Sequence, residues 1–169
     1  MAKILNFKQL VKEVVKLKKE GKKIGYCNGN YDMLHPGHAK HFESAKKMCD
    51  VLVVSVASDA FVRKWKGKGR PVFSEKLRAY MVSQLESVDL VTINTHPKGS
   101  GIKFFNLLKP NYYIRGPDYI KSQIKEYLRE KGRAIKAGCL VRFTKDTKLS
   151  TRDIIQAIKE DRTYEIEFL

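Results

Sequence analysis

The sequence feature that most constrains the fold is the run Val51–Ala57 (VLVVSVA), in which apolar β-branched residues follow one another almost without interruption. A strand of this kind offers no polar face to solvent, so it is typical of the centre of a parallel sheet that is covered on both faces. Amphipathic stretches with helical spacing lie on either side of it, at residues 6–20 and 74–87. The run therefore predicts an α/β fold.

Strand-like and helix-like segments alternate along the rest of the chain. The other expected strands are residues 23–28, 88–94, 112–115 and 140–144, and the expected helices are residues 6–20, 36–48, 58–66, 74–87, 102–108, 121–137 and 150–159. This alternation predicts a Rossmann-like five-stranded parallel sheet with right-handed crossovers and helices on both faces. Without a linker or an internal repeat, residues 1–169 are expected to form a single domain. Residues 96–101 are expected to form a loop, and residues 164–169 alternate like an edge strand.

The chain carries 34 basic and 18 acidic residues, a formal net charge of +16. Such a charge suits nucleic acid, an anionic membrane surface or a phosphate-rich small substrate. The chain shows no recognition motif or aromatic stacking platform for nucleic acid, and no apolar run of the roughly 18 residues that span a bilayer.

The N-terminal segment lacks the apolar region of a signal peptide, so we expect a cytoplasmic protein. Three widely spaced cysteines predict reduced, mostly buried thiols rather than a metal site.

The segment Asn28–His38 (NGNYDMLHPGH) joins the first long strand directly to a helix that begins at Pro36. Free backbone N–H groups and the helix dipole favour a phosphate at such a junction. His35 and His38 lie three residues apart and can donate N–H groups to the same phosphate, as nucleotidyl transfer requires. A loop histidine beside a core histidine, or a pair of zinc ligands, is the alternative interpretation.

This segment resembles the HxGH signature of the cytidylyltransferase-like nucleotidyltransferases, and the resemblance covers nearly the whole chain. GKKIGYCNGNYD, GRPV, VDLV and GPDY resemble the heptose 1-phosphate adenylyltransferase group, and glycerol-3-phosphate cytidylyltransferases are close relatives. The resemblance implies that His35 and His38 stabilise the α-phosphate in the transition state. The nucleotide is then expected to contact the surrounding residues, Asn28, Gly29, Tyr31, Asp32 and Gly37.

The resemblance implies further site residues in three other segments. In the basic loop RKWKGKGR, two lysines are expected to contact phosphates, and they match Lys64 and Lys66. Arg78, in the next helix, matches an arginine near the nucleotide. In the segment RGPDY, the family's G-x-D element corresponds to Gly116 and Asp118, and the Asp118 carboxylate can accept hydrogen bonds from a base or a ribose.

The last implied segment opens the final helix, where the family binds the β- and γ-phosphates. Ser150 and Thr151 match the family pattern, whereas Arg152 replaces a threonine and Lys145 stands in the place of an arginine. Arg152 can add a phosphate contact, or it can indicate a different substrate. Asp59, after the second strand, is a weaker site candidate.

These expectations combine into a nucleotidyltransferase that uses a nucleoside triphosphate and a phosphorylated sugar or polyol. The resemblance favours ATP with heptose 1-phosphate, and CTP with glycerol 3-phosphate is the alternative. Flavin adenylyltransferases of the archaeal type share the signature, and a basic nucleic-acid-binding module is the alternative from another class. Mg²⁺ is expected to bind through the substrate phosphates rather than through a dedicated metal site. A homodimer is compatible with the family.

Overall fold

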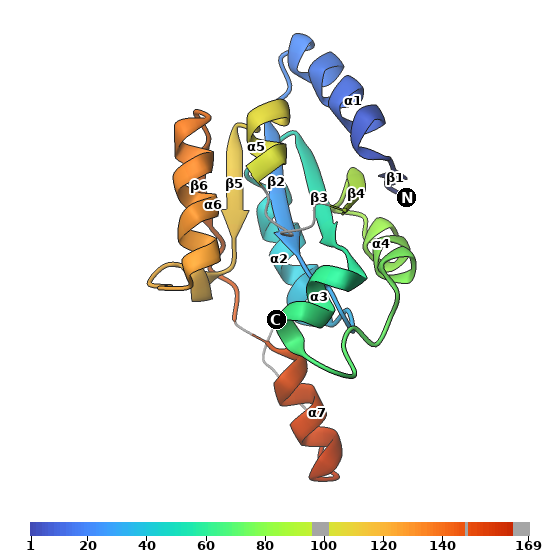
Figure 1. The fold of residues 1–169 in the computed structure, drawn as a ribbon. Helices are drawn as coiled ribbons and strands as arrows, with labels where there is room; N and C mark the ends of the chain where they lie inside the picture. The colour runs from blue at the N-terminus through green and yellow to red at the C-terminus, as the bar shows by residue number, and fades with distance from the viewer. Residues whose placement is uncertain (96–101, 148, 164–169) are drawn as a thin grey trace.

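The computed structural model contains one six-stranded parallel sheet with the strand order β1-β4-β3-β2-β5-β6 (Figure 1). It describes residues 1–95, 102–147 and 149–163, so the expected loop 96–101 and the expected edge strand 164–169 lie outside the described residues. The strands are β1 (Lys3–Ile4), β2 (Ile24–Gly29), β3 (Val51–Ala57), β4 (Leu90–Asn94), β5 (Tyr112–Arg115) and β6 (Leu140–Phe143). The α/β class and the parallel sheet are confirmed.

The expected number of five strands is wrong, because the short strand β1 adds a sixth at one edge of the sheet. Lys3 pairs with Leu90 and Ile4 with Val91 in a parallel register. Two residues are too few to show the period-2 alternation by which a strand is recognised from sequence. The pairing depends instead on β4, which lies far away in the chain.

Helices cover both faces of the sheet, as expected. They are α1 (Phe7–Lys19), α2 (Pro36–Lys46), α3 (Asp59–Lys66), α4 (Glu75–Ser83), α5 (Ile102–Leu108), α6 (Lys125–Lys136) and α7 (Thr151–Lys159), with a 3₁₀ turn η1 (Pro117–Tyr119) before α6. One hydrophobic cluster joins α1, α5 and α6 to one face of the sheet. A second cluster joins α2 and α4 to the other face. None of the helices in the described part of the chain is long and apolar enough to span a membrane.

The side-chain alternation of β2 divides the two clusters. Tyr26 is fully buried among Phe104, Phe105 and Tyr113 on the α5 and α6 face. Cys27 points to the opposite face, where it belongs to the cluster beneath α2. Its thiol forms no disulfide and is buried, as expected, and burial raises its pKa above the usual value. Side chains at the carboxyl end of β2 are therefore distributed to both faces of the sheet.

Short polar caps fix the helix ends that surround the carboxyl edge of the sheet. Ser58, Ser74 and Ser150 each accept a hydrogen bond from the backbone N–H three residues further on, at the first turns of α3, α4 and α7. The helix expected over residues 121–137 is shorter, because α6 begins at Lys125, after a turn at residue 121 and three residues without regular structure.

Strand order reverses beside β2, and this reversal positions the site. From β2 the chain proceeds to β3 on one side, whereas β5 pairs with β2 on its other side. In open parallel sheets, ligands bind beyond the carboxyl ends of the strands at such a point. The loops after Gly29, Ala57 and Arg115 all leave the sheet at this edge.

We predict that the core beneath α5 contributes strongly to stability. Replacing fully buried Phe105 with Ala should lower the free energy of unfolding by about 3–5 kcal/mol, because it leaves a cavity among packed aromatic rings. Leu107 on the same helix is 51% exposed, and Leu107→Ala should change stability by no more than about 0.5 kcal/mol. Urea denaturation followed by circular dichroism measures both values, and equal losses would contradict this description of the core.

Candidate active site

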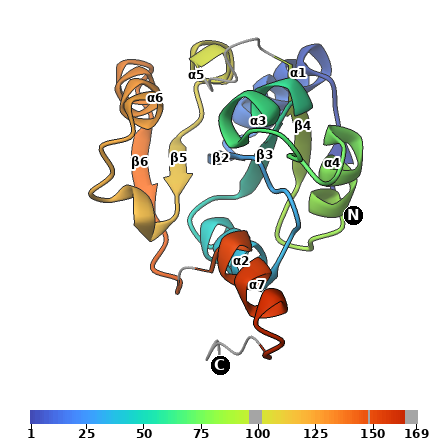
Figure 2. The same cartoon turned by 60° about the horizontal axis from the view of Figure 1, so that its bottom comes forward.

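A cavity of about 750 Å³ lies at the carboxyl edge of the sheet. It is bounded by the loop after β2, the first turns of α2, the end of α3, the η1 turn and the start of α7. In Figure 2, which brings the bottom of Figure 1 forward, the ribbon of α7 passes in front of α2. Most site residues expected from sequence line it: Asn28, Gly29, Tyr31, Asp32, His35, Gly37, His38, Lys66, Gly116, Asp118, Ser150, Thr151 and Arg152.

The two signature histidines form a stacked pair within this cavity. Their ring centroids lie 3.7 Å apart, with an interplanar angle of 25°. The backbone N–H of His35 donates to Nδ1 of His38 over 3.4 Å. Because Nδ1 of His38 accepts this bond, the neutral ring carries its proton on Nε2, where it can donate to a ligand.

Close packing holds the pair in place. A side-chain carbon added at Gly37 would lie 2.8 Å from Cβ of Leu149, which forces a shift, and 3.2 Å from Nδ1 of His35, which is a tight contact. Glycine at this position therefore lets the chain pack closely against Leu149 and the ring of His35. The ring of Tyr31 meets the ring of His38 edge-on at 5.5 Å. Tyr31 has a φ angle of +50°, a left-handed conformation that few non-glycine residues adopt and that is concentrated at functional sites.

The histidines are neutral in this environment. Burial, together with the charges that His35 and His41 would carry when protonated, lowers the pKa of His38 to about 3. Burial also lowers the pKa of His35 below its usual value. Near pH 7 both rings are therefore neutral donors, poised to interact with an anion rather than carrying fixed positive charge.

His41 is a cavity residue that the sequence analysis missed. It lies one helical turn beyond His38 on α2, and its Nδ1 is 3.1 Å from Oγ1 of Thr144, while its Nε2 is 3.6 Å from Sγ of Cys27. Burial and the nearby charge of Arg115 lower its pKa to about 4. The i,i+3 spacing from His38 was the signal that could have identified it.

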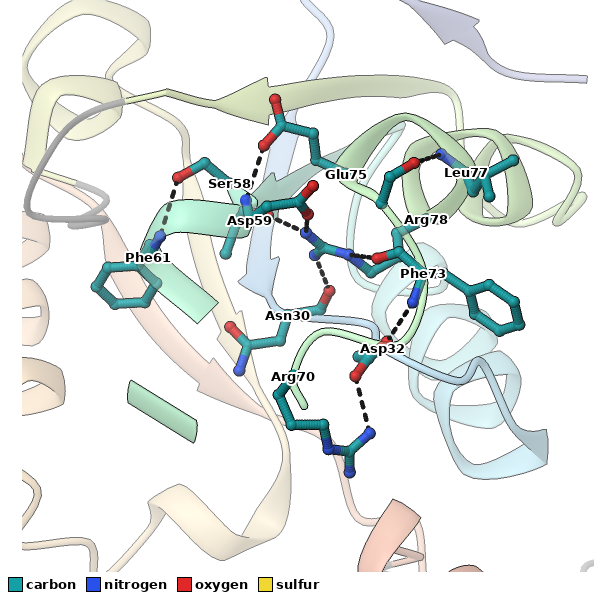
Figure 3. Close-up of polar contacts among 12 residues, drawn as sticks. Asn30, Asp32, Ser58, Asp59, Phe61, Arg70, Phe73, Glu75, Leu77 and Arg78 are labelled. Atoms are coloured by element: carbon teal, nitrogen blue, oxygen red, sulfur yellow. Dashed lines mark hydrogen bonds and ion pairs between the residues drawn. The ribbon is translucent and has the colours of Figure 1, made fainter. Parts of the chain in front are cut away.

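Asp32 connects the histidine loop to the basic loop (Figure 3). Its carboxylate accepts a hydrogen bond from the guanidinium of Arg70 over 2.8 Å, and also from the backbone N–H groups of Val72 and Phe73. The Asp32 side chain is only 9% exposed. It therefore anchors the end of the basic loop beside the histidines.

Arg78 is not among the residues that line the cavity, and its expected place near the nucleotide stays a prediction. Its side chain is fully buried and donates to the carbonyl oxygens of Phe73, Asn30 and Ala57. It also forms an ion pair with Asp59 at 2.7 Å, which gives that carboxylate a structural role (Figure 3). Arg78 therefore joins three loops around the site.

The N-terminus of α7 supplies hydroxyl groups to the cavity. The Oγ of Ser150 accepts from the backbone N–H of Asp153 over 3.3 Å, and Oγ1 of Thr151 donates to the carbonyl oxygen of Asp32 over 3.2 Å. Arg152 also lines the cavity. Hydroxyls, backbone N–H groups and the positive end of the helix dipole make this turn suitable for phosphates.

The sequence analysis also missed Arg115, the last residue of β5. Its guanidinium donates to both the carbonyl and the side-chain oxygen of Asn28 over 2.6 Å, and it lies 3.7 Å from the ring centroid of Tyr119. The carboxylate of Glu130 accepts from Asn28 and from the hydroxyl of Tyr113. The position of Arg115 at a strand end, just before the G-x-D element, is the sequence signal that could have identified it as a site residue.

Of the two lysines expected to contact phosphates, only Lys66 lines the cavity. Lys64 is exposed on α3, outside the cavity lining as far as the structure describes the chain. The two residues lie two positions apart, so an α-helix places them on different faces. The helix expected over residues 58–66 already contained both lysines, so their separation follows from the helix itself.

Comparison with known proteins identifies relatives of the chain. The chain is 39% identical over 121 residues to the bifunctional protein HldE of Bradyrhizobium sp. (strain ORS 278). The aligned region covers 72% of this chain and 24% of the relative. It is 42% identical over 105 residues to HldE of Rhodopseudomonas palustris (strain BisA53), and this aligned region covers 62% of this chain and 21% of the relative. The chain thus spans about a quarter of the length of these relatives.

A solved structure gives the same fold. The lipopolysaccharide core biosynthesis protein from Thermoplasma volcanium GSS1 superposes with a TM-score of 0.61 at 28% identity, over 77% of this chain and 100% of that chain. Residues 26–157 match the model of the cytidylyltransferase-like family, and this match contains the histidine pair, Lys66 and the start of α7. The chain therefore belongs to the cytidylyltransferase-like family.

Proposed function

We propose that the chain transfers a nucleoside monophosphate from a nucleoside triphosphate, preferably ATP, to a phosphorylated sugar such as heptose 1-phosphate, and releases pyrophosphate. The observation that carries this proposal is the stacked, neutral pair His35 and His38, which shares one cavity with Lys66 and the N-terminus of α7. Donors of this kind stabilise charge that develops on a transferred phosphate.

The reaction requires only positioning and charge stabilisation. An oxygen of the acceptor phosphate attacks the α-phosphorus in line, one P–O bond forms, and the bond to the bridging oxygen of the β-phosphate breaks. His35 and His38 donate to the α-phosphate oxygens, while Lys66, Ser150 and Thr151 hold the departing pyrophosphate. The acceptor phosphate is already an anion, so the protein needs no nucleophile of its own.

We propose that Mg²⁺ enters with the triphosphate. The cation would neutralise part of the triphosphate charge and bind mainly through phosphate oxygens. The carboxylate of Asp32 is engaged by Arg70 and two backbone N–H groups, so it is poorly suited to act as a metal ligand. Within the described ranges, no three His, Cys, Asp or Glu residues group so as to hold a metal ion.

The choice of acceptor is supported by the relatives. Matches to HldE proteins and to a lipopolysaccharide core biosynthesis protein favour a sugar phosphate that is destined for a surface polysaccharide. Transfer from CTP to glycerol 3-phosphate is the second candidate, because the family model is described as cytidylyltransferase-like. Both reactions use the same histidine pair.

Pyrophosphate release tests the proposal. Each nucleoside triphosphate is assayed with heptose 1-phosphate, other sugar phosphates and glycerol 3-phosphate, and the largest rate is expected for ATP with heptose 1-phosphate. His38→Ala should lower kcat about 10²–10³-fold, the loss typical when a donor to a developing charge is removed. Lys40→Ala, on the same helix but outside the cavity lining, is the control and should retain activity. A His38→Ala enzyme with full turnover would refute the proposal.

The two lysines of α3 provide a second test. Because Lys66 lines the cavity and Lys64 does not, Lys66→Ala should lower kcat/KM at least about tenfold, equivalent to about 1.4 kcal/mol of transition-state stabilisation. Lys64→Ala should have a clearly smaller effect. Steady-state kinetics with varied ATP measure both variants, and a larger loss for Lys64→Ala would show that the observed orientation of α3 is not the reactive one.

A further inference from the structure

The three helices that cover one face of the sheet carry a large excess of basic residues. They are α1, α5 and α6, which share one hydrophobic cluster with that face, and α5 contacts both of the others. Figure 2 shows the three helices along the top of the view. Their sequences contain five basic residues in α1, one in α5 and five in α6, against three acidic residues in the three helices together. The exposed side of these helices therefore forms a basic face.

The acidic residues of these helices do not offset the charge at the surface. Ten of the eleven basic residues are exposed, whereas none of the three glutamates is. Glu130 is buried, and Glu13 is paired with Lys3 of β1 over 3.4 Å. None of the eleven basic residues forms an ion pair with a carboxylate in the described part of the chain. Their charges are available to an anionic partner.

The helices α2 and α4, on the opposite face of the sheet, differ in this respect. Together they contain four basic residues. Three of these four form ion pairs with carboxylates, namely Lys40 with Glu43, Lys46 with Asp89 and Arg78 with Asp59. The positive charge of the protein is thus concentrated on the side of α1, α5 and α6.

Aliphatic side chains lie among the cations of the basic face. Each of the three helices contributes at least one such side chain that is between 41% and 56% exposed, and the set consists of Val15, Leu107, Leu128 and Ile135. On α6, every exposed residue is either aliphatic or basic. The basic face therefore offers apolar contacts as well as positive charge.

This combination favours an anionic lipid surface over other polyanions. A bilayer presents phosphate groups to the cations and an apolar layer to the aliphatic side chains, and both terms strengthen interfacial binding. Single-stranded nucleic acid binds largely by stacking on aromatic rings, and the exposed aromatic side chains among the described residues, Trp65, Phe73 and Tyr80, lie outside these helices. A second copy of the chain would present the same positive charge and be repelled.

We infer that the basic face docks the protein on an anionic membrane surface. Its lysines and arginines contact lipid phosphates, while its aliphatic side chains enter the boundary between headgroups and acyl chains. The helix α2 packs on the opposite face, so the docked protein keeps the histidine pair at the start of α2 on the side away from the lipid. This inference does not depend on the proposed reaction, because none of the residues that carry it takes part in that reaction.

Sedimentation with vesicles tests the inference. Vesicles of phosphatidylcholine alone, and of phosphatidylcholine with an equal amount of phosphatidylglycerol, are incubated with the protein at low salt, and binding is expected only with the anionic vesicles. Replacing Arg129 and Arg133 together with Gln should lower the partition coefficient about tenfold or more, because each basic residue near an anionic surface contributes about fivefold. Replacing Leu128 and Ile135 together with Gln should lower it at least about fivefold, because apolar area is lost from the interface.

Each double variant has a matched control on other elements. Lys40→Gln with Lys76→Gln removes the same net charge from α2 and α4, and Leu77→Gln with Ile158→Gln removes two exposed aliphatic side chains from α4 and α7. Both controls should bind anionic vesicles as wild type does, and thermal denaturation verifies that all variants fold. Pyrophosphate release without vesicles should stay at the wild-type rate in both α6 variants.

Four results would overturn the inference. They are equal binding to both kinds of vesicle, equal losses in the controls and the α6 variants, unchanged binding after replacement of Leu128 and Ile135, and displacement of the protein from anionic vesicles by duplex DNA at the same phosphate concentration. The last result would assign the basic face to nucleic acid. Vesicle binding that follows the expected pattern in a protein without pyrophosphate release would refute the proposed function and retain the docking face.

Discussion

The geometry of the site depends on the connection between the loop after β2 and the loop after α3. The carboxylate of Asp32 holds Arg70 and the backbone N–H groups of Val72 and Phe73, while Arg78 holds the carbonyl oxygens of Asn30 and Phe73. Buried ionic contacts of this kind are costly to break, because one partner is left without compensation. They fix both loops against the sheet, so that Lys66 and the histidines face one cavity.

Charge is distributed unevenly around this cavity. The chain as a whole carries a formal charge of +16, yet burial keeps the rings of His35 and His38 neutral. In the proposed reaction, an incoming triphosphate would meet cationic side chains such as Lys66 and Arg152 and, at its α-phosphate, neutral N–H donors. The two histidine rings keep the same protonation state near neutral pH, and their N–H donors are already in place. The site therefore reorganises little when negative charge develops on the transferred phosphate.

The sequence predicted those features that depend on local pattern. Val51–Ala57 identified the parallel sheet, and His35 and His38 identified the site, because a strand, a glycine-bearing turn and a helix start follow one another there. Features that depend on distant partners were missed. The strand β1 exists only through its pairing with β4, and the full burial of Arg78 depends on carbonyl acceptors from three loops. Arg115 gains its position from contacts with Asn28 and Tyr119.

The central claim is that the α-phosphorus of the nucleotide is the atom attacked. It is tested most directly by supplying ATP labelled with ³²P at either the α- or the γ-position, together with heptose 1-phosphate, and by separating the products. Label from the α-position should appear in the sugar product, while label from the γ-position should appear only in pyrophosphate. Transfer of the γ-label to the sugar would show a kinase and would contradict the role assigned here to His35 and His38.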